Sequence, residues 1–269
     1  MLIEGSVISD IGRIRQNNED NFFLNGLYRK DINNRLFTST EIADCRQAVY
    51  AVCDGMGGEE YGEIASLCAA SALKILKNAP FTEELLDKYI KNVQSDIINK
   101  SHNLLSESMG STLALLYIKD NTGYALNLGD SRIYLYRRGK LKQLTKDHTQ
   151  ASLLIDSGIL TADEARQHIS SHMLTRYLGT GSNITAKDIY KAENIKLYKD
   201  DIFLLCSDGL TDMLPDNEIE QSLFKTYKNG TGFIVQNLCT KALEAGGRDN
   251  ITCIAVKMVK KGRFLSLNK

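Results

Sequence analysis

Acidic residues stand at the ends of apolar segments at five places along the chain. These places are Glu19-Asp20, Asp54, Asp130, Asp208 and Asp249. Asp54 follows VYAVC and Asp208 follows IFLLCS, and a glycine comes directly after each of them. An acid at the mouth of a buried strand is partly desolvated, and several such acids that converge repel one another unless cations neutralise them. Hard divalent ions with oxygen ligands, Mg²⁺ or Mn²⁺, suit such a cluster.

Each of these acids, taken singly, also fits a simpler structural role. Asp-Gly is a common turn pair, and an aspartate that follows a strand can cap the next helix. Five such sites, with VCDG and CSDG as near copies, favour a shared metal site instead. The residue pattern alone therefore indicates a di-metal hydrolase of unknown substrate.

Short apolar runs predict the strands that position these acids. The runs are 49–53, 112–118, 124–128, 133–136, 202–206 and 251–258. Arg138-Gly139 predicts a hairpin turn between 133–136 and 141–144. The polar segment 27–46 predicts a long loop or an extended hairpin.

Three segments have apolar or small residues at helical spacing. Their shared faces are Ile64, Cys68, Ser71 and Ile75; Leu86, Ile90, Val93 and Ile97; and Ile234, Leu238 and Ala242. Thr82 is a suitable N-cap for the second helix, and Gly246-Gly247 would end the third. The sequence Thr161-Ala162-Asp163-Glu164 has the capping-box pattern, so we expect a short helix within a surface lobe at 147–180.

The order of these elements differs from the regular alternation of a parallel βαβ sheet. It predicts an α+β sandwich of antiparallel sheets with flanking helices. With only two prolines and no Gly/Ser-rich linker, the chain shows no domain boundary. Lys+Arg and Asp+Glu number 33 each, so overall charge does not favour nucleic acid or an anionic membrane as a partner.

The six cysteines form no CxxC pair and no zinc-like spacing. Most lie in apolar runs, and we expect them to be buried and reduced. The N-terminal sequence MLIEGSVISD is not typical of a signal peptide, and no apolar run approaches the ~20 residues of a membrane span. A cytoplasmic location is therefore the expectation.

Several short motifs occur in a fixed order along nearly the whole chain. They are SDIGRIRQNNED (9–20), DGMGG (54–58), GST (110–112), GDSR (129–132), LTKDH (144–148), SDGL (207–210) and GRDNIT (247–252). In this order and spacing the chain resembles the metal-dependent protein phosphatases of type 2C, in their compact bacterial form. The resemblance implies a four-layer α-β-β-α sandwich whose two central sheets are mainly antiparallel. It also implies one phosphatase domain over 1–262, with a flap lobe around 147–180 and a short tail at 263–269.

The resemblance also implies roles for individual residues. Asp54, Asp208, Asp249 and the Gly55 carbonyl would ligate two central Mn²⁺ or Mg²⁺ ions, Glu19 and Asp20 would act nearby, directly or through metal-bound waters, and Asp130 with Asp208 would hold a weaker third ion. Arg15 would bind the substrate phosphate, because its planar fork suits paired phosphate oxygens. Without the NNED sequence that follows it, Arg15 would be interpreted as a solvated surface arginine.

The reaction implied is hydrolysis of phosphoserine and phosphothreonine in proteins by a metal-bridging water, without a phosphoenzyme. Phosphoproteins of a serine/threonine kinase system would be the substrates, and a monomer is the default expectation. One alternative is a catalytically dead phosphopeptide-binding module. That alternative predicts a lost carboxylate, and all the expected ones are present. A second alternative, a hydrolase of small phosphoesters on the same scaffold, is separable only by substrate profiling.

Two features depart from the family pattern. Met56 stands where eukaryotic relatives carry a histidine proposed as general acid, and a thioether cannot donate that proton. Leaving-group protonation would then come from metal-bound water or be unimportant for acidic leaving groups. In the flap lobe, Ile169 replaces the usual proline. We expect no catalytic role for His148, His168 or His172, because their spacing matches no metal motif.

Overall fold

Two antiparallel β-sheets form the centre of the molecule in the computed structural model, which describes residues 1–56, 61–77, 79–105, 109–180 and 184–260. The first sheet has the order β10 (Lys140–Gln143), β9 (Arg132–Arg137), β13 (Ile202–Cys206), β14 (Ile251–Val259), β1 (Leu2–Asp10) and β3 (Leu36–Asp44). The second has the order β11 (Tyr190–Lys191), β8 (Thr122–Leu128), β7 (Leu113–Lys119), β4 (Gln47–Cys53) and β2 (Asn21–Leu24), and β12 (Ile195–Lys196) also pairs with β8.

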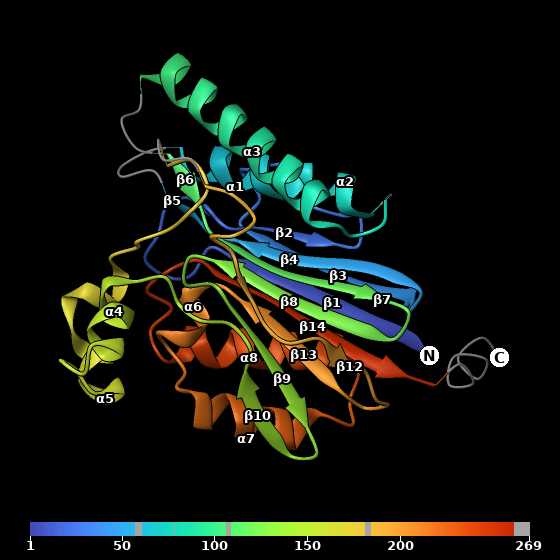
Figure 1. The fold of residues 1–269 in the computed structure, drawn as a ribbon. Coiled ribbons are helices and arrows are strands. Elements are labelled where there is room, and N and C mark those ends of the chain that lie inside the picture. Colours follow the sequence, from blue (N-terminus) through green and yellow to red (C-terminus); the bar gives the residue numbers. More distant parts are fainter. Residues whose placement is uncertain (57–60, 78, 106–108, 181–183, 261–269) are drawn as a thin grey trace.

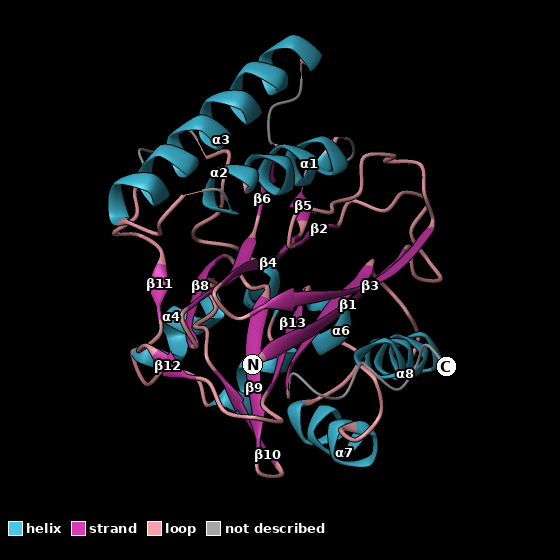
Figure 2. Ribbon diagram, turned by 90° about the vertical axis from the view of Figure 1, so that its right-hand side faces the viewer, coloured by secondary structure: helices cyan, strands magenta, loops and turns pink. Residues whose placement is uncertain are grey.

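Helices cover the outer face of each sheet. The helices α1 (Gly62–Ala72), α2 (Lys74–Lys77) and α3 (Glu83–Leu104) lie over the second sheet, whereas α6 (Asp208–Thr211), α7 (Asp216–Thr226) and α8 (Thr231–Glu244) lie over the first (Figures 1 and 2). The chain therefore forms the four-layer α-β-β-α sandwich that the motifs implied.

Strands whose two faces are both buried explain the continuous apolar runs. In β4, Val49 and Ala51 pack toward the helices, and Tyr50 and Val52 pack between the sheets. Strand β14 divides its side chains in the same way, between the inter-sheet core and the core under α8. All six cysteines are free and buried, as expected.

The helix signals in the sequence are confirmed. Thr82 accepts a hydrogen bond from the Leu85 N–H at the start of α3, and the Gly247 N–H donates to the Ala242 carbonyl beyond the end of α8. The predicted helix at 64–75 is divided at Leu73 into α1 and α2. The hairpin turn at Arg138-Gly139 is also confirmed, with φ values of 53° and 83° that match a two-residue primed turn.

The flap lobe lies outside the four layers, at one end of the sandwich (Figure 1). It contains α4 (Gln150–Asp156), α5 (Ala162–Gln167) and the 3₁₀ helix η1 (Ile169–His172). The predicted capping box is present: the Thr161 hydroxyl accepts from the Glu164 N–H, and Glu164 accepts from the Thr161 N–H.

The prediction for 27–46 is only partly correct. The segment contains β3, which pairs over nine residues with β1 and so forms no hairpin of its own. Exposed and half-buried residues alternate along β3, which is an edge strand, and its polar residues at 38–41 are consecutive. The strand β1 was absent from the predicted strands. Gly57 and Gly58 of the DGMGG motif and the expected tail at 263–269 lie outside the described residues. No helix in the described ranges is long and apolar enough to cross a membrane.

Candidate metal centre

A cavity of about 280 Å³ collects most of the predicted site residues at the flap end of the sandwich. Its lining residues are Arg15, Glu19, Asp54, Gly55, Met56, Thr112, Asp130, His172, Leu174, Asp208, Asp249 and Asn250. A larger hollow of about 610 Å³, lined by Lys199, Tyr227 and Lys257 among others, contains none of the predicted acids. The concentration of carboxylates therefore distinguishes the site, and cavity size does not.

Strand ends and short backbone contacts position Asp54. Asp54 directly follows β4, its N–H donates to the Thr112 hydroxyl at 2.9 Å, and the Thr112 N–H donates to its carbonyl at 2.8 Å. The next residue begins β5 (Gly55–Met56), which pairs with β6 (Gly110–Ser111). A Cβ atom on Gly55 would lie 2.1 Å from the Gly62 carbonyl oxygen, so this close approach requires glycine.

Asp208 and Asp249 lie beside one another because β13 and β14 are neighbours. Asp208 is the first residue of α6, two residues after β13 ends, and Asp249 stands two residues before β14 begins. The Asn250 side chain connects this end of the sheet to the N-terminal motif. It accepts from the Glu19 N–H at 2.7 Å and donates to the Ile11 and Asn17 carbonyls, both at 2.9 Å.

Asp130 is presented by a turn that His148 holds. The Gly129 N–H donates to His148 Nδ1 at 3.1 Å, and the His148 N–H donates to the Gly129 carbonyl at 2.9 Å. His148 therefore has a structural role next to the site, and burial lowers the pKa of its imidazole.

Asp20 lies behind the cavity wall. It is 1% exposed, and its carboxylate accepts a hydrogen bond from the Ser207 hydroxyl at 2.8 Å. Glu19, in contrast, lines the cavity. The adjacent acids of the NNED motif thus occupy different depths, with Glu19 at the surface of the cavity and Asp20 beneath it.

The carboxylates strongly perturb one another. Burial, followed by the charge of Asp20, raises the pKa of Asp54 well above its usual range, and burial with the charge of Asp208 does the same for Asp130. Burial and the charges of Asp212 and Asp249 raise the pKa of Asp208 to about 6, and burial raises the pKa of Asp20 to about 8. A cluster of ionised carboxylates in this setting requires cations.

Arg15 is the arginine among the described residues that line the cavity, and it forms an ion pair with Asp249. Its Nη2 lies 2.7 Å from Asp249 Oδ2, with the two side chains 50% and 31% exposed. Partial burial lowers the pKa of Arg15, but the hydrogen bond and charge of Asp249, with smaller effects from Glu19 and Asp208, bring the net value above its usual range. A single guanidinium cannot balance the acids that share this cavity. The donor set consists of hard oxygens, so it fits Mg²⁺ or Mn²⁺.

Comparisons with known proteins identify the family of this chain. The model of the protein phosphatase 2C family matches residues 29–232. The serine/threonine phosphatase stp of Listeria monocytogenes is similar along nearly the whole chain, with 32% identity over 268 residues that cover 96% of this chain and 98% of that protein. The chain belongs to the protein phosphatase 2C family.

Solved structures of serine/threonine phosphatases have the same fold as this chain. The catalytic domain of the serine/threonine protein phosphatase PstP, in complex with two manganese ions, superimposes with a TM-score of 0.77 at 28% identity, covering 97% of this chain and 100% of that one. The serine/threonine phosphatase of S. agalactiae gives a TM-score of 0.78 at 27% identity, over 96% and 100% of the two chains. The antiparallel sandwich is thus the fold of the protein phosphatase 2C family.

Several residues that support this site were not identified from the sequence. Arg29 is 1% exposed and donates to the Asn18 and Asp20 carbonyls, which flank Glu19, at 2.6 and 2.5 Å. Nothing in the polar segment around Arg29 marks it as buried. Thr112 and Asn250 were visible as members of motifs, but their hydrogen bonds to the Asp54 and Glu19 backbone could not be read from the sequence.

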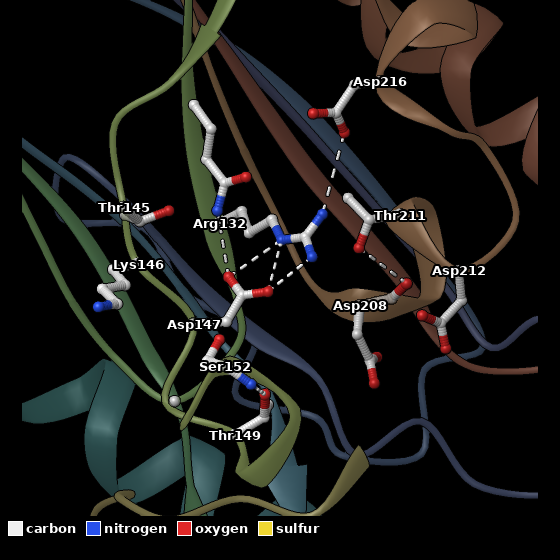
Figure 3. A network of polar contacts seen from close by, with 12 residues as sticks. Arg132, Thr145, Lys146, Asp147, Thr149, Ser152, Asp208, Thr211, Asp212 and Asp216 are labelled. Carbon is white, nitrogen blue, oxygen red and sulfur yellow. Dashed lines mark hydrogen bonds and ion pairs between the residues drawn. The ribbon is translucent and has the colours of Figure 1, made fainter. Parts of the chain in front are cut away.

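A second network lies beside the cavity, between the first sheet and the flap lobe. Arg132 Nε and Nη2 contact both carboxylate oxygens of Asp147 at 2.6–3.0 Å, and Asp216 lies 3.9 Å from its Nη1 (Figure 3). This pairing joins two motifs that are separate in the sequence, GDSR and LTKDH. They meet through Arg132 and Asp147 and attach the start of the flap lobe to β9.

Proposed function

We propose that this chain is a metal-dependent protein phosphatase that removes phosphate from phosphoserine and phosphothreonine. The observation that carries the proposal is the convergence of Asp54, Asp208 and Asp249 on the cavity that Arg15 also lines. Membership of the protein phosphatase 2C family and similarity to relatives named serine/threonine phosphatases support it.

Two central ions, Mn²⁺ or Mg²⁺, would be held by Asp54, Asp208, Asp249 and the Gly55 carbonyl. The two manganese ions of the similar PstP structure support this number and one of these metals. Glu19 faces the same cavity and would contact an ion directly or through water. We assign buried Asp20 to the support of this site from behind. Asp130, with Asp208, would hold a weaker third ion.

When bound, such ions supply a water that is deprotonated near neutral pH and can attack phosphorus in line. Arg15 binds the equatorial phosphate oxygens and stabilises their charge in a loose transition state. Its present partner, Asp249, is also a proposed ligand, so ligation of Asp249 leaves the guanidinium available for phosphate. Met56 lines the cavity, and its thioether has no proton to donate, so this side chain cannot protonate the leaving group.

We extend the proposal to the cellular setting. The phosphatase domain spans 1–262, and its substrates are phosphoproteins of a serine/threonine kinase system. We propose that the chain acts as a cytoplasmic monomer, without nucleic acid or membrane as a partner.

A metal titration of phosphothreonine-peptide hydrolysis tests the proposal. We compare the wild type with Asp249→Asn, Asp208→Asn and Asp130→Ala, and use Asp163→Asn on the exposed face of α5 as the matched control. Loss of a metal carboxylate should lower kcat/KM by about 100-fold or more, a size similar to the loss of a transition-state electrostatic contact. Asp130→Ala should instead shift the activation curve to higher metal concentration. Full activity of Asp249→Asn would overturn the assignment of the metal ligands.

The same assay separates the alternatives. Turnover of small aryl phosphates without turnover of any phosphopeptide would indicate a small-phosphoester hydrolase. Phosphopeptide binding without turnover at any metal concentration would indicate a binding module. Either result contradicts the proposal.

A further inference from the structure

A histidine of the flap lobe faces two aspartates of α6 across the edge of the cavity. His172, Asp208 and Asp212 each offer a ligand atom, and these atoms all lie within 4.8 Å of one another. The Asp212 N–H donates to the Asp208 carbonyl at 2.8 Å, so the two aspartates are one helical turn apart. Their carboxylates project on the same side of α6 (Figure 3).

His172 stands where three cavities meet. It lines the cavity of the proposed central ions and also two neighbouring cavities, of about 380 and 340 Å³, that extend along the flap lobe and along α6. Asp208 and Asp130 line both the first and the second of these cavities. An ion at His172 would therefore lie beside the central ions, on the side of Asp208 that faces the flap.

The backbone around His172 is tied to both the lobe and the sandwich. His172 is the last residue of η1. The His168 side chain caps η1 by accepting a hydrogen bond from the N–H of Ser170, which is buried. The next residues return toward the sheet: the Gln150 N–H donates to the Met173 carbonyl at 2.9 Å, and the Thr175 N–H donates to the His148 carbonyl at 2.8 Å. These contacts place the imidazole opposite α6.

A direct bond between His172 and Asp212 does not account for the arrangement. Nδ1 lies 3.6 Å from Asp212 Oδ2, which is too long for a hydrogen bond, and the side chains are 61% and 39% exposed. An exposed pair of this kind contributes little to stability. Ligands about 2.0–2.2 Å from one ion lie about 3–4.4 Å apart, so the observed spread needs only a small side-chain adjustment to hold an ion.

We propose that His172 is a nitrogen ligand, supplied by the flap lobe, for an ion that Asp208 and Asp212 also bind. This inference rests on the proposed function, since Asp208 is also a proposed ligand of the central ions and, with Asp130, of the weaker third ion, whose ligand set His172 and Asp212 would complete. The ion would join the flap lobe to α6, so its occupancy would set how firmly the lobe is held over the cavity. Imidazole suits first-row transition metals, whereas Mg²⁺ prefers oxygen, so this site should favour Mn²⁺ or Co²⁺ over Mg²⁺.

Mn²⁺ binding followed by electron paramagnetic resonance tests the inference without any assay of activity. The full chain is titrated with Mn²⁺, and stoichiometry, affinity and nitrogen hyperfine coupling are measured for the wild type, His172→Ala and Asp212→Asn. His102→Ala, which removes an exposed imidazole at the end of α3, is the matched control. We expect the wild type and the control to bind an ion with nitrogen coupling, beyond the central ions. His172→Ala should lose that coupling and weaken this ion by roughly tenfold or more.

The outcomes separate the two proposals. A wild type that binds the central ions but no nitrogen-coupled ion, or a His172→Ala variant that keeps the coupling, overturns the role of His172 and leaves the proposed function intact. A wild type that binds no Mn²⁺ overturns both. Circular dichroism of the metal-free variants establishes that each is folded.

Hydrogen exchange gives a second readout of the same ion. Mn²⁺ should slow amide exchange in 150–172 of the wild type, because an ion that joins the lobe to α6 suppresses local opening. The slowing should be absent in His172→Ala and present in His102→Ala. Equal slowing in His172→Ala would contradict the link between flap and ion.

Discussion

Arg15 and Asp249 form an ion pair at the mouth of the cavity, although each has another proposed partner during catalysis. The guanidinium is half-exposed and surrounded by acids, so it stays charged, and it is close enough to the cavity to reach a phosphate group. This position suits an anchor that exchanges a carboxylate for the phosphate of the substrate.

Replacing Arg15 tests this exchange. Arg15→Ala should lower kcat/KM for a phosphothreonine peptide by about 10- to 100-fold, the size expected for a charged hydrogen bond of about 1.5–3 kcal/mol. Arg15→Lys should recover only part of this loss, because an ammonium cannot bind two oxygens in one plane. Arg13→Ala, at an exposed position two residues away, is the control. Steady-state kinetics in which Arg15→Ala equals the wild type would exclude the anchor.

Met56 leaves the cavity without the histidine found in eukaryotic relatives. Met56→His should accelerate hydrolysis of phosphoserine peptides, whose alkoxide leaving group needs a proton, and leave aryl phosphates with acidic leaving groups almost unchanged. Paired kcat measurements on both substrate classes check this. No change on either class would argue that leaving-group protonation does not limit this enzyme.

At the scale of elements, short contacts between turns hold the acids in place. His148 fixes the Gly129 turn before Asp130, Thr112 fixes Asp54 at the end of β4, and Arg29 holds the carbonyls around Glu19. Each anchor comes from a segment distant in sequence from the acid that it positions. The precision of the site therefore depends on how the elements pack.

The half-buried His148 should make stability depend on pH. Burial lowers its pKa in the folded protein, so the unfolded chain takes up the proton first as pH falls below about 6.5. The resulting loss of folding free energy is absent above that pH. It grows as the pH falls toward the lower pKa of His148 in the folded protein. Urea unfolding of the wild type and His148→Gln should show the wild type losing more stability between pH 7 and pH 5, relative to pH 8. His102→Gln is the control, and parallel pH profiles for all three proteins would contradict this prediction.

At the scale of the whole molecule, two packed sheets bring the ends of several strands to one edge of the sandwich. Burial, and after it the charges of neighbouring acids, raise the pKa values of Asp54 and Asp130, so ionising the whole cluster is unfavourable in the metal-free protein. Divalent ions should offset this unfavourable ionisation and stabilise the entire fold, because they bind the assembled site and not the unfolded chain.

Thermal unfolding measures this linkage. At ~100 times the Kd, one bound ion adds about 2.7 kcal/mol. For a domain of this size that corresponds to a rise in Tm of about 5–10 °C. A chelator should reverse the rise, and Asp54→Asn should abolish most of it, whereas Asp163→Asn should retain it. A Tm that does not respond to Mn²⁺ in the wild type would contradict an assembled metal site.

Much of the architecture followed from local patterns. The runs around Val49 and Ile254 are apolar without interruption because both faces of their strands are buried, and the spacing of Leu86, Ile90 and Val93 reflects one buried helix face. Strand β3 was harder to identify because it is an edge strand whose residues 38–41 are all polar, and β1 was not predicted. Patterns within one segment cannot specify its pairing partner, which lies elsewhere in the chain.

The sequence by itself determined the family, the set of acids and the order of their motifs, because these depend on residue types and spacing along one chain. Tertiary structure alone decided depth and adjacency. It placed Glu19 on the cavity and Asp20 behind it, buried Arg29 beneath the NNED motif, and brought His172 of the flap lobe to Asp208 and Asp212. Burial and distance arise from packing between segments far apart in sequence, so the carboxylates became a graded site only when the sheets came together.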